Sequence, residues 1–480
     1  MPVNILIMGA TGYIGGRLAP RLDQEGHRVR CLTRRPEHLA EIDWAATVEI
    51  VRGDALERES LDAAMDGIDV VYYLVHSIGT GASFEASDRT AARNTAEAAA
   101  AAGVARIVYL GGLVPSGEEA SPHLASRAEV GQIFLDGLVP AVVLQAGVII
   151  GSGSASFEML RYLTERLPVM VTPRWVTSLV QPIAVRDVLS YLLGVLDLPP
   201  DTDRRFDIGG PDVLSYREMM QRYAAVAGLT RRIIVPVPVL TPWLSSQWVN
   251  VVTPVPKAIA QPLIESLRNN VVAQEHDIEA LIPLDLCPFD QAVRLALERI
   301  RLADVVTRWS GASWPGAPSD PMPTDPEWSG GSVYRDERER QVEASPDALW
   351  RAVEGSGGEQ GWYSCPLAWA VRGVIDRIVG GVGLRRGRRN PDHLVLGDAV
   401  DFWRVEALDR PNLLRLRAEM LLPGEAWLEF SVDDRDGAPV LHQRALFIPR
   451  GLAGHLYWWA VFPFHGIVFG SMIANPGPRR

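Results

Sequence analysis

A short glycine-rich stretch at the start of the chain restricts its fold more than any other feature. The apolar run of residues 5–8 stops at three glycines spaced three residues apart, Gly9, Gly12 and Gly15. Beyond them, apolar residues recur at helical spacing. This order predicts a buried parallel strand, a tight turn and a helix N-terminus. Gly9 permits the sharp turn, Gly12 lets the backbone approach a pyrophosphate, and Gly15 lets the helix pack closely on the strand.

Such a turn directs backbone N–H groups and the positive end of a helix at bound phosphates. An ordinary strand–helix turn rarely needs glycine at three such positions. We therefore interpret this stretch as a dinucleotide-binding site, to which Thr11, Tyr13 and Ile14 also belong.

The spacing G-x-x-G-x-x-G, with Thr11 and Tyr13 between the glycines, resembles the extended and atypical short-chain dehydrogenase/reductases. The resemblance covers about the first 300 residues. Strand-like runs alternate with helical ones, which favours an α/β fold with a doubly wound parallel Rossmann sheet. The expected strands after the first one are residues 26–33, 48–54, 70–75, 106–110 and 141–145.

The end of the second strand bears on the choice of cofactor. Folds that prefer NAD place an acidic residue there for the ribose hydroxyls, whereas a 2′-phosphate needs cations. This chain has Arg34 and Arg35 and no acid. Because a guanidinium pairs with phosphate through two donors, we favour NADP(H) over NAD(H). The alternative is a solvated basic turn.

The resemblance also assigns residues to the adenosine side of the cofactor. Asp54 and Ala55 follow the third strand, where the family contacts adenine. Asp54 has a second interpretation as a helix N-cap, since the following residues look helical. Leu74, Val75 and His76 follow the fourth strand and are expected beside the adenosine.

The catalytic residues of the family are missing. Its members carry a Ser or Thr after the fifth strand, then a Tyr and a Lys four residues apart. Here that strand ends in Gly111 and Gly112, and the later stretch reads His123-Leu-Ala-Ser-Arg127. His123 is the candidate proton donor, because an imidazole can donate a proton near neutral pH. Arg127 can hold a ribose or phosphate but is a poor base.

Ser116 and Ser126 are two further hydroxyls that can orient a substrate. The alternative for His123 is a loop or cap residue in a site that transfers no hydride.

Composition excludes several classes of function. A net charge of -11 argues against general nucleic-acid binding. Cys31, Cys287 and Cys365 are far apart and form neither a disulfide framework nor a zinc motif, which predicts a reducing cytoplasm. The nine histidines show no metal-ligand spacing, and the chain enters its first strand without a signal peptide.

The chain divides into predicted segments by composition. Residues 1–308 form the cofactor-binding domain, with a Rossmann core at about 1–150 and a substrate and lid region at about 151–308. Within that region, the apolar, proline-broken stretch 233–267 reads as a wall over an apolar pocket or as packing between domains. Residues 309–332 carry five prolines and read as a linker.

Residues 333–480 have a different pattern. A charged strand at 334–342 precedes a helix capped by Ser345 with Pro346 at its first position. Strand-like runs follow at 398–405, 413–420, 427–432 and 440–447, with turns at 409–412 and 433–437. A long apolar helix at 452–474 closes the chain. This order resembles the α+β START-like helix-grip superfamily, which implies an apolar ligand cavity.

The last helix is long enough to span a membrane but contains His455, Pro463 and His465. We expect it to be buried or interfacial, with at most peripheral membrane contact.

The fusion of the two modules resembles a bacterial group of predicted NAD(P)-binding oxidoreductases. The first module also resembles the nucleotide-binding accessory subunit of respiratory complex I. One hypothesis is an NAD(P)H-dependent oxidoreductase for an apolar carbonyl, quinone or lipid-like substrate. The other is a non-catalytic NADPH-binding scaffold or sensor whose second domain binds a ligand or partner.

Overall fold

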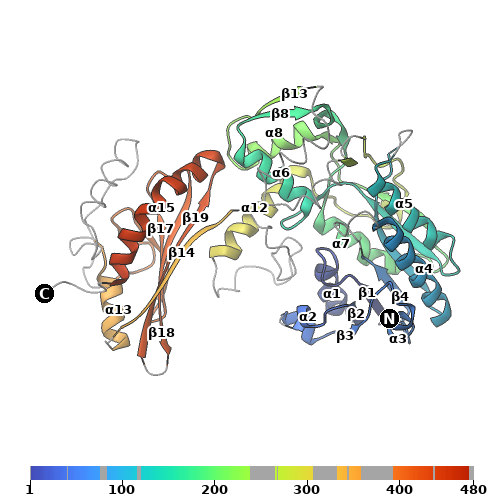
Figure 1. Cartoon of the computed structure of the whole chain (residues 1–480), viewed down its shortest axis with the longest axis horizontal. Helices are drawn as coiled ribbons and strands as arrows, with labels where there is room; N and C mark the ends of the chain where they lie inside the picture. The colour runs from blue at the N-terminus through green and yellow to red at the C-terminus, as the bar shows by residue number, and fades with distance from the viewer. Residues whose placement is uncertain are drawn as a thin grey trace. The chain divides into compact units, whose positions relative to one another are not determined.

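The computed structural model contains two compact units, Met1–Gly331 and Ser332–Arg480 (Figure 1). His76, Ser116, Cys365 and most of the stretches 233–267 and 309–332 lie outside the described residues. The structure describes residues 2–40, 42–75, 84–115, 120–237, 265–266, 269–305, 332–342, 345–357, 393–435 and 438–474.

The first unit is built on a seven-stranded sheet with the order β11-β6-β5-β4-β1-β2-β3. Every pairing in this sheet is parallel, and Met8 lies opposite both Leu32 and Tyr73. The predicted doubly wound α/β fold is therefore confirmed. The strands are β1 (Asn4–Met8), β2 (Arg28–Thr33), β3 (Glu49–Arg52), β4 (Val70–Tyr73), β5 (Arg106–Gly112), β6 (Ala141–Ala146) and β11 (Arg204–Ile208).

Alternate residues of β1 enter two different hydrophobic cores. Ile5 and Ile7 pack in a cluster that includes α1 and α7, whereas Leu6 and Met8 pack in one that includes α3, α4 and α5. Both faces of the central strands are buried for this reason, which explains their unbroken apolar sequences. The helices are α1 (Gly15–Gln24), α3 (Arg58–Ala64), α4 (Phe84–Ala102), α5 (Pro122–Leu135) and α7 (Val185–Gly194).

A third cluster packs beyond the carboxyl ends of β5 and β6 and joins α6, α8 and α12. Short strand pairs β7–β10, β9–β12 and β8–β13 hold these helices together. Of the proline-broken stretch 233–267, only β13 and residues 265–266 lie within the described residues. The elements are α6 (Ala155–Arg166), α8 (Tyr216–Val226), α12 (Phe289–Val305), β7 (Ile149–Ile150), β8 (Val169–Pro173), β9 (Leu179–Val180), β10 (Ile183–Ala184), β12 (Leu214–Ser215) and β13 (Ile233–Val237).

Five short elements complete the described part of this unit. They are α2 (Glu37–Ala40), α11 (Asp277–Leu281) and the 3-10 helices η1 (Asp43–Ala46), η2 (Arg174–Thr177) and η3 (Val195–Asp197).

The second unit contains a six-stranded antiparallel sheet with the order β14-β19-β18-β17-β16-β15. Its first strand therefore pairs with its last. The predicted cap of α13 is present, since the Ser345 hydroxyl accepts a hydrogen bond from the Ala348 amide at 3.2 Å. The elements are β14 (Tyr334–Gln341), α13 (Pro346–Gly355), β15 (Ala399–Val400), β16 (Trp403–Asp409), β17 (Leu413–Ala418), β18 (Gly424–Arg435), β19 (Ala438–Pro449) and α15 (Gly451–Ala474).

Two predicted boundaries in this unit are wrong. The run 398–405 is not one strand, because Asp401 adopts a positive φ of 56° and separates β15 from β16. Residues 433–435 belong to strand β18 instead of the predicted turn, because they pair with residues 438–440 of β19.

Helix α15 packs one side on this sheet, where Trp458 stacks on Tyr334 with ring centroids 5.0 Å apart. Leu456, Trp459 and Phe464 on the same helix are exposed. Within the described residues, Gly451–Ile473 is the one segment that is long and apolar enough to cross a membrane.

Candidate functional site

The glycine turn after β1 has a backbone that other residues do not fit. Gly9 has a φ of +97°, and a Cβ placed there would lie 2.7 Å from the Leu74 carbonyl oxygen. A Cβ on Gly15 would collide with the Gly9 carbonyl oxygen. The Gly12 amide donates to that same oxygen at 3.0 Å, which closes the turn. The turn therefore offers bare backbone at the N-terminus of α1, as a pyrophosphate requires.

The other predicted cofactor residues surround this turn. Leu74 and Val75 follow β4 and contact Gly9 at the point where the strand order reverses, which is where open α/β sheets bind ligands. The remaining described members lie in the turn itself or directly after β2 and β3: Thr11, Tyr13, Ile14, Arg34, Arg35, Asp54 and Ala55. Since the carboxyl ends of parallel strands share one edge, these residues lie along the edge of the sheet where the sequence predicts a dinucleotide.

Arg34 and Arg35 are both exposed after the carboxyl end of β2. The Arg35 amide donates to the Thr33 hydroxyl at 3.2 Å, which fixes the backbone of this turn. Because Arg34 is exposed, an anion can reach its guanidinium donors.

Asp54 does not cap a helix, so that interpretation is wrong. Helix α3 begins later, with Glu57 at its N-cap position. One Asp54 carboxylate oxygen instead accepts from the Leu56 amide at 3.0 Å, closing a local turn. The Asn94 side chain on α4 donates to the Ala55 carbonyl at 3.1 Å and holds the turn in place.

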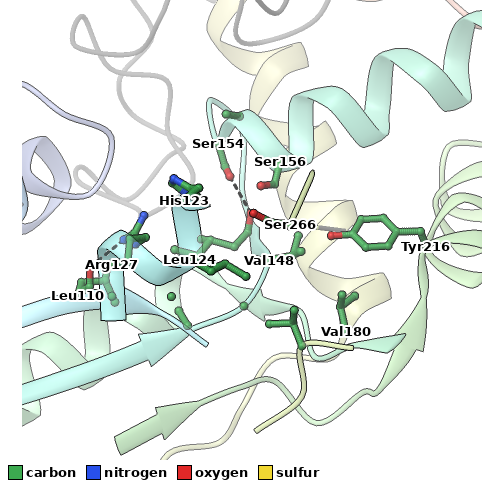
Figure 2. Close-up of a pocket in the computed structure, with 17 residues that line it drawn as sticks. Leu110, His123, Leu124, Arg127, Val148, Ser154, Ser156, Val180, Tyr216 and Ser266 are labelled. Atoms are coloured by element: carbon green, nitrogen blue, oxygen red, sulfur yellow. Dashed lines mark hydrogen bonds between the residues drawn. The ribbon is translucent and has the colours of Figure 1, made fainter. Parts of the chain in front are cut away.

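A pocket of about 190 Å³ lies beyond the carboxyl ends of β5 and β6 (Figure 2). This is below the range of about 300–1,000 Å³ typical of sites for drug-sized ligands, so it suits one reacting group. The described residues that line it include no Asp or Glu. The lining residues are Leu110, Gly111, Gly112, His123, Leu124, Arg127, Ala146, Gly147, Val148, Ile149, Ser154, Ala155, Ser156, Val180, Tyr216, Ser266 and Val271.

Helix α5 brings His123 and Arg127 to this pocket from the same face, since they are four residues apart. The Ser121 hydroxyl caps the helix by accepting from the Leu124 amide at 3.3 Å, and Pro122 occupies the first position. His123 is therefore a helical residue, only 6% exposed, and its interpretation as a loop or cap residue is wrong.

Arg127 lies beside the end of β5. Its Nη2 donates to the Leu110 carbonyl at 2.8 Å, whereas its Nε is buried and has no hydrogen-bond partner. A Cβ on Gly112 would lie 3.6 Å from that Nε. A buried donor without an acceptor costs about 1–3 kcal/mol, and other atoms of Arg127 line the pocket.

Of the two serines considered as orienting hydroxyls, Ser126 does not line the pocket. Its hydroxyl lies 3.4 Å from the Asp88 carboxylate on α4. The sequence did not indicate that Ser154, Tyr216 or Ser266 would reach this site. A Ser215–Glu218 capping box begins α8, but nothing local to it points to the pocket.

The described part of the chain contains neither a candidate metal site nor a candidate reactive thiol. No group of three His, Cys, Asp or Glu residues there has the geometry of a metal site. Cys31 and Cys287 are buried, and burial raises the pKa of the Cys31 thiol to about 12, so it stays protonated.

The parallel sheet, the glycine turn and the pocket beside it define a Rossmann-fold nucleotide-binding protein. Residues 9–136 match the family described as NAD(P)H-binding, and residues 328–472 match Protein of unknown function (DUF2867).

Two relatives extend the match. The (4-alkanoyl-5-oxo-2,5-dihydrofuran-3-yl)methyl phosphate reductase of Streptomyces griseus is 30% identical over 231 residues, 47% of this chain and 74% of the relative. The ceramide reductase of Caulobacter vibrioides is 32% identical over 239 residues, 48% of this chain and 72% of the relative. The chain therefore belongs to the NAD(P)H-binding oxidoreductases of the short-chain dehydrogenase/reductase type.

A solved structure agrees on the fold. Citrobacter triphenylmethane reductase, complexed with NADP(H), matches with a TM-score of 0.50 and 21% identity, over 61% of this chain and 99% of that chain.

Proposed function

We propose that this protein is an NADP(H)-preferring reductase or dehydrogenase of the atypical short-chain type, acting on an apolar carbonyl, quinone or lipid-like substrate. The observation that carries the proposal is the placement of His123 and Arg127. Both line one pocket next to the cofactor edge of the sheet, although the usual Tyr and Lys are absent.

The chain's own residues supply the steps around a hydride transfer. Bound NAD(P)H would give a hydride, with its electron pair, to the carbonyl carbon of the substrate. The C=O π pair then moves to the oxygen, which takes a proton from the imidazolium form of His123. The Arg127 guanidinium, held by its bond to the Leu110 carbonyl, stabilises the developing negative charge. Solvent returns a proton to His123, and an alcohol leaves.

The pocket walls support an apolar substrate. Leu110, Leu124, Val148, Val180 and Val271 form much of the lining. The ceramide reductase relative is named for a lipid substrate, which agrees with this assignment.

We further propose that the second unit is a helix-grip domain that holds the apolar substrate or a similar ligand. Its first strand pairs with its last, and a long C-terminal helix packs on the sheet, as in the START-like arrangement. The exposed aromatic side of α15 is suited to peripheral contact with a membrane, and the buried thiols suit the cytoplasm.

The test is His123→Ala, with NADPH oxidation followed during addition of apolar ketones and quinones. General acid catalysis typically contributes about 10²–10⁴-fold, so kcat should fall by that factor while NADPH affinity changes little. The matched control is His276→Ala, because His276 is exposed and pairs with Glu279 away from the pocket. Equal activity of the His123 variant and the native protein would rule out His123 as the donor.

One observation favours a second function, a non-catalytic NADPH-binding scaffold or sensor. Strand β5 ends in Gly111 and Gly112, which place no hydroxyl at the pocket. A native protein that binds NADPH tightly but never oxidises it across the substrate panel would support this alternative.

A further inference from the structure

Tyr216 reaches the same pocket from a distant part of the chain. It is the first residue of α8, its side chain is only 5% exposed, and it lines the pocket with His123 and Arg127. Figure 2 shows its phenol oxygen pointing inward from the side opposite His123. Polar side chains from two helices, α5 and α8, therefore line the same pocket.

The backbone at Tyr216 is held rigidly. The preceding residue, Ser215, accepts from the Glu218 amide at 3.2 Å, and its own amide donates to the Glu218 carboxylate at 2.7 Å. Strand β12 pairs Ser215 with Leu179 and Leu214 with Val180. The Tyr216 ring packs in the apolar cluster that contains Leu214 and Val180. Its hydroxyl is thus placed by the fold, as a preorganised donor must be.

The surroundings keep that hydroxyl protonated. Burial raises the pKa of Tyr216 above the usual value of 10.0. The described walls contain no carboxylate that would compete for its proton. A carbonyl oxygen suits such a pocket, because it accepts hydrogen bonds from the donors of His123, Arg127 and Tyr216.

We propose that the Tyr216 hydroxyl donates a hydrogen bond to the substrate's carbonyl oxygen from the wall opposite His123. In the family, a Ser or Thr hydroxyl after the fifth strand orients the substrate. Here β5 ends in Gly111 and Gly112, so the Tyr216 hydroxyl takes that role. This assignment rests on the proposed reductase function, and it makes carbonyl compounds the substrates of this site.

The test is Tyr216→Phe, which keeps the ring and removes only the hydroxyl. Loss of one donor to a developing oxyanion typically costs about 10²–10³-fold in kcat, and we expect a loss of about that size with NADPH affinity unchanged. Because Tyr216 does not titrate in the working range, the pH profile of kcat should keep its shape. The profile should change in His123→Ala, since that variant loses the proposed proton donor.

The matched control is Tyr223→Phe. Tyr223 is on the same helix and is fully buried, but its hydroxyl donates to Glu165 at 2.6 Å and does not line the pocket. This control should lose stability with little change in kcat. A native-like kcat in Tyr216→Phe, or a loss of kcat no larger than that of Tyr223→Phe, would overturn the role of Tyr216. If His123→Ala has lost its activity in the same assay, the proposed reductase function would still stand. Absence of turnover in the native protein would overturn the reductase function and this role together.

Discussion

Replacing Gly9 by Ala tests the cofactor site most directly. Residues other than glycine pay about 1–2 kcal/mol in the left-handed region that Gly9 occupies at φ +97°. The new Cβ would also lie 2.7 Å from the Leu74 carbonyl oxygen and 2.9 Å from its carbon. Both contacts are with backbone, so β4 or the turn must move, and overpacking of this kind costs about 1–3 kcal/mol more.

Gly26→Ala separates the two effects. Gly26 has a similar φ of +87°, but a Cβ there would meet nothing within 4 Å. It should therefore lose only the backbone part of the stability, about 1–2 kcal/mol. Its affinity for NADPH should equal that of the native protein, because it lies at the other end of α1.

The assay pairs urea unfolding with NADPH titration by calorimetry. In Gly9→Ala we expect NADPH to bind at least about tenfold more weakly, which corresponds to about 1.4 kcal/mol. Native affinity in Gly9→Ala would refute the placement of the pyrophosphate at this turn. Equal loss of affinity in Gly26→Ala would show that general destabilisation, not the turn, weakens binding.

Three further predictions concern single side chains. Arg34→Ala should lower the affinity for NADPH by about 10-fold or more, with little effect on the affinity for NADH. Arg28→Ala, at the other end of β2, should change neither affinity, and equal losses for both cofactors in Arg34→Ala would refute the NADP(H) preference. Arg127→Ala should lower kcat, measured by steady-state kinetics, by about 10²-fold, and Arg127→Lys should lower it by less because lysine keeps the charge. Equal kcat values for the two variants would contradict the charge argument. Hydrogen bonds from the Ser215 amide and hydroxyl lower the pKa of Glu218 below 4.5, so they stabilise the folded protein above that pH, and this stability is lost as pH falls through the folded pKa. In thermal unfolding, Glu218→Gln should therefore lose less stability on acidification than the native protein does.

Features set by backbone sterics and short-range hydrogen bonds were predictable. The turn at Gly9 and the caps at Ser345 and Ser215 each depend on residues within a few positions of one another. The parallel sheet followed from apolar runs that alternate with helical ones, and the structure confirms it. The predicted strand 398–405 failed, because the run contains Asp401, whose left-handed backbone ends one strand and starts another.

Side-chain partners were harder to predict than backbone. Asp54 has the residue type of an N-cap and precedes a helix, yet Glu57 occupies that position. Ser126 lies one residue before Arg127, but the helical rotation of about 100° per residue turns it toward Asp88. In both cases the choice depended on how two neighbouring elements pack.

The sequence by itself determined the cofactor turn and the α/β architecture, because glycine conformations and burial of apolar runs act locally or by simple periodicity. The spacing of four between His123 and Arg127 puts both on one helix face, but the structure was needed to show that they lie within helix α5. Only the tertiary structure decided that Tyr216 meets them, about 90 residues later in the chain. That meeting depends on the packing of α8 against α6 and α12 and on the pairing of β12 with β9, a long-range arrangement for which no local pattern in the sequence carries a signal.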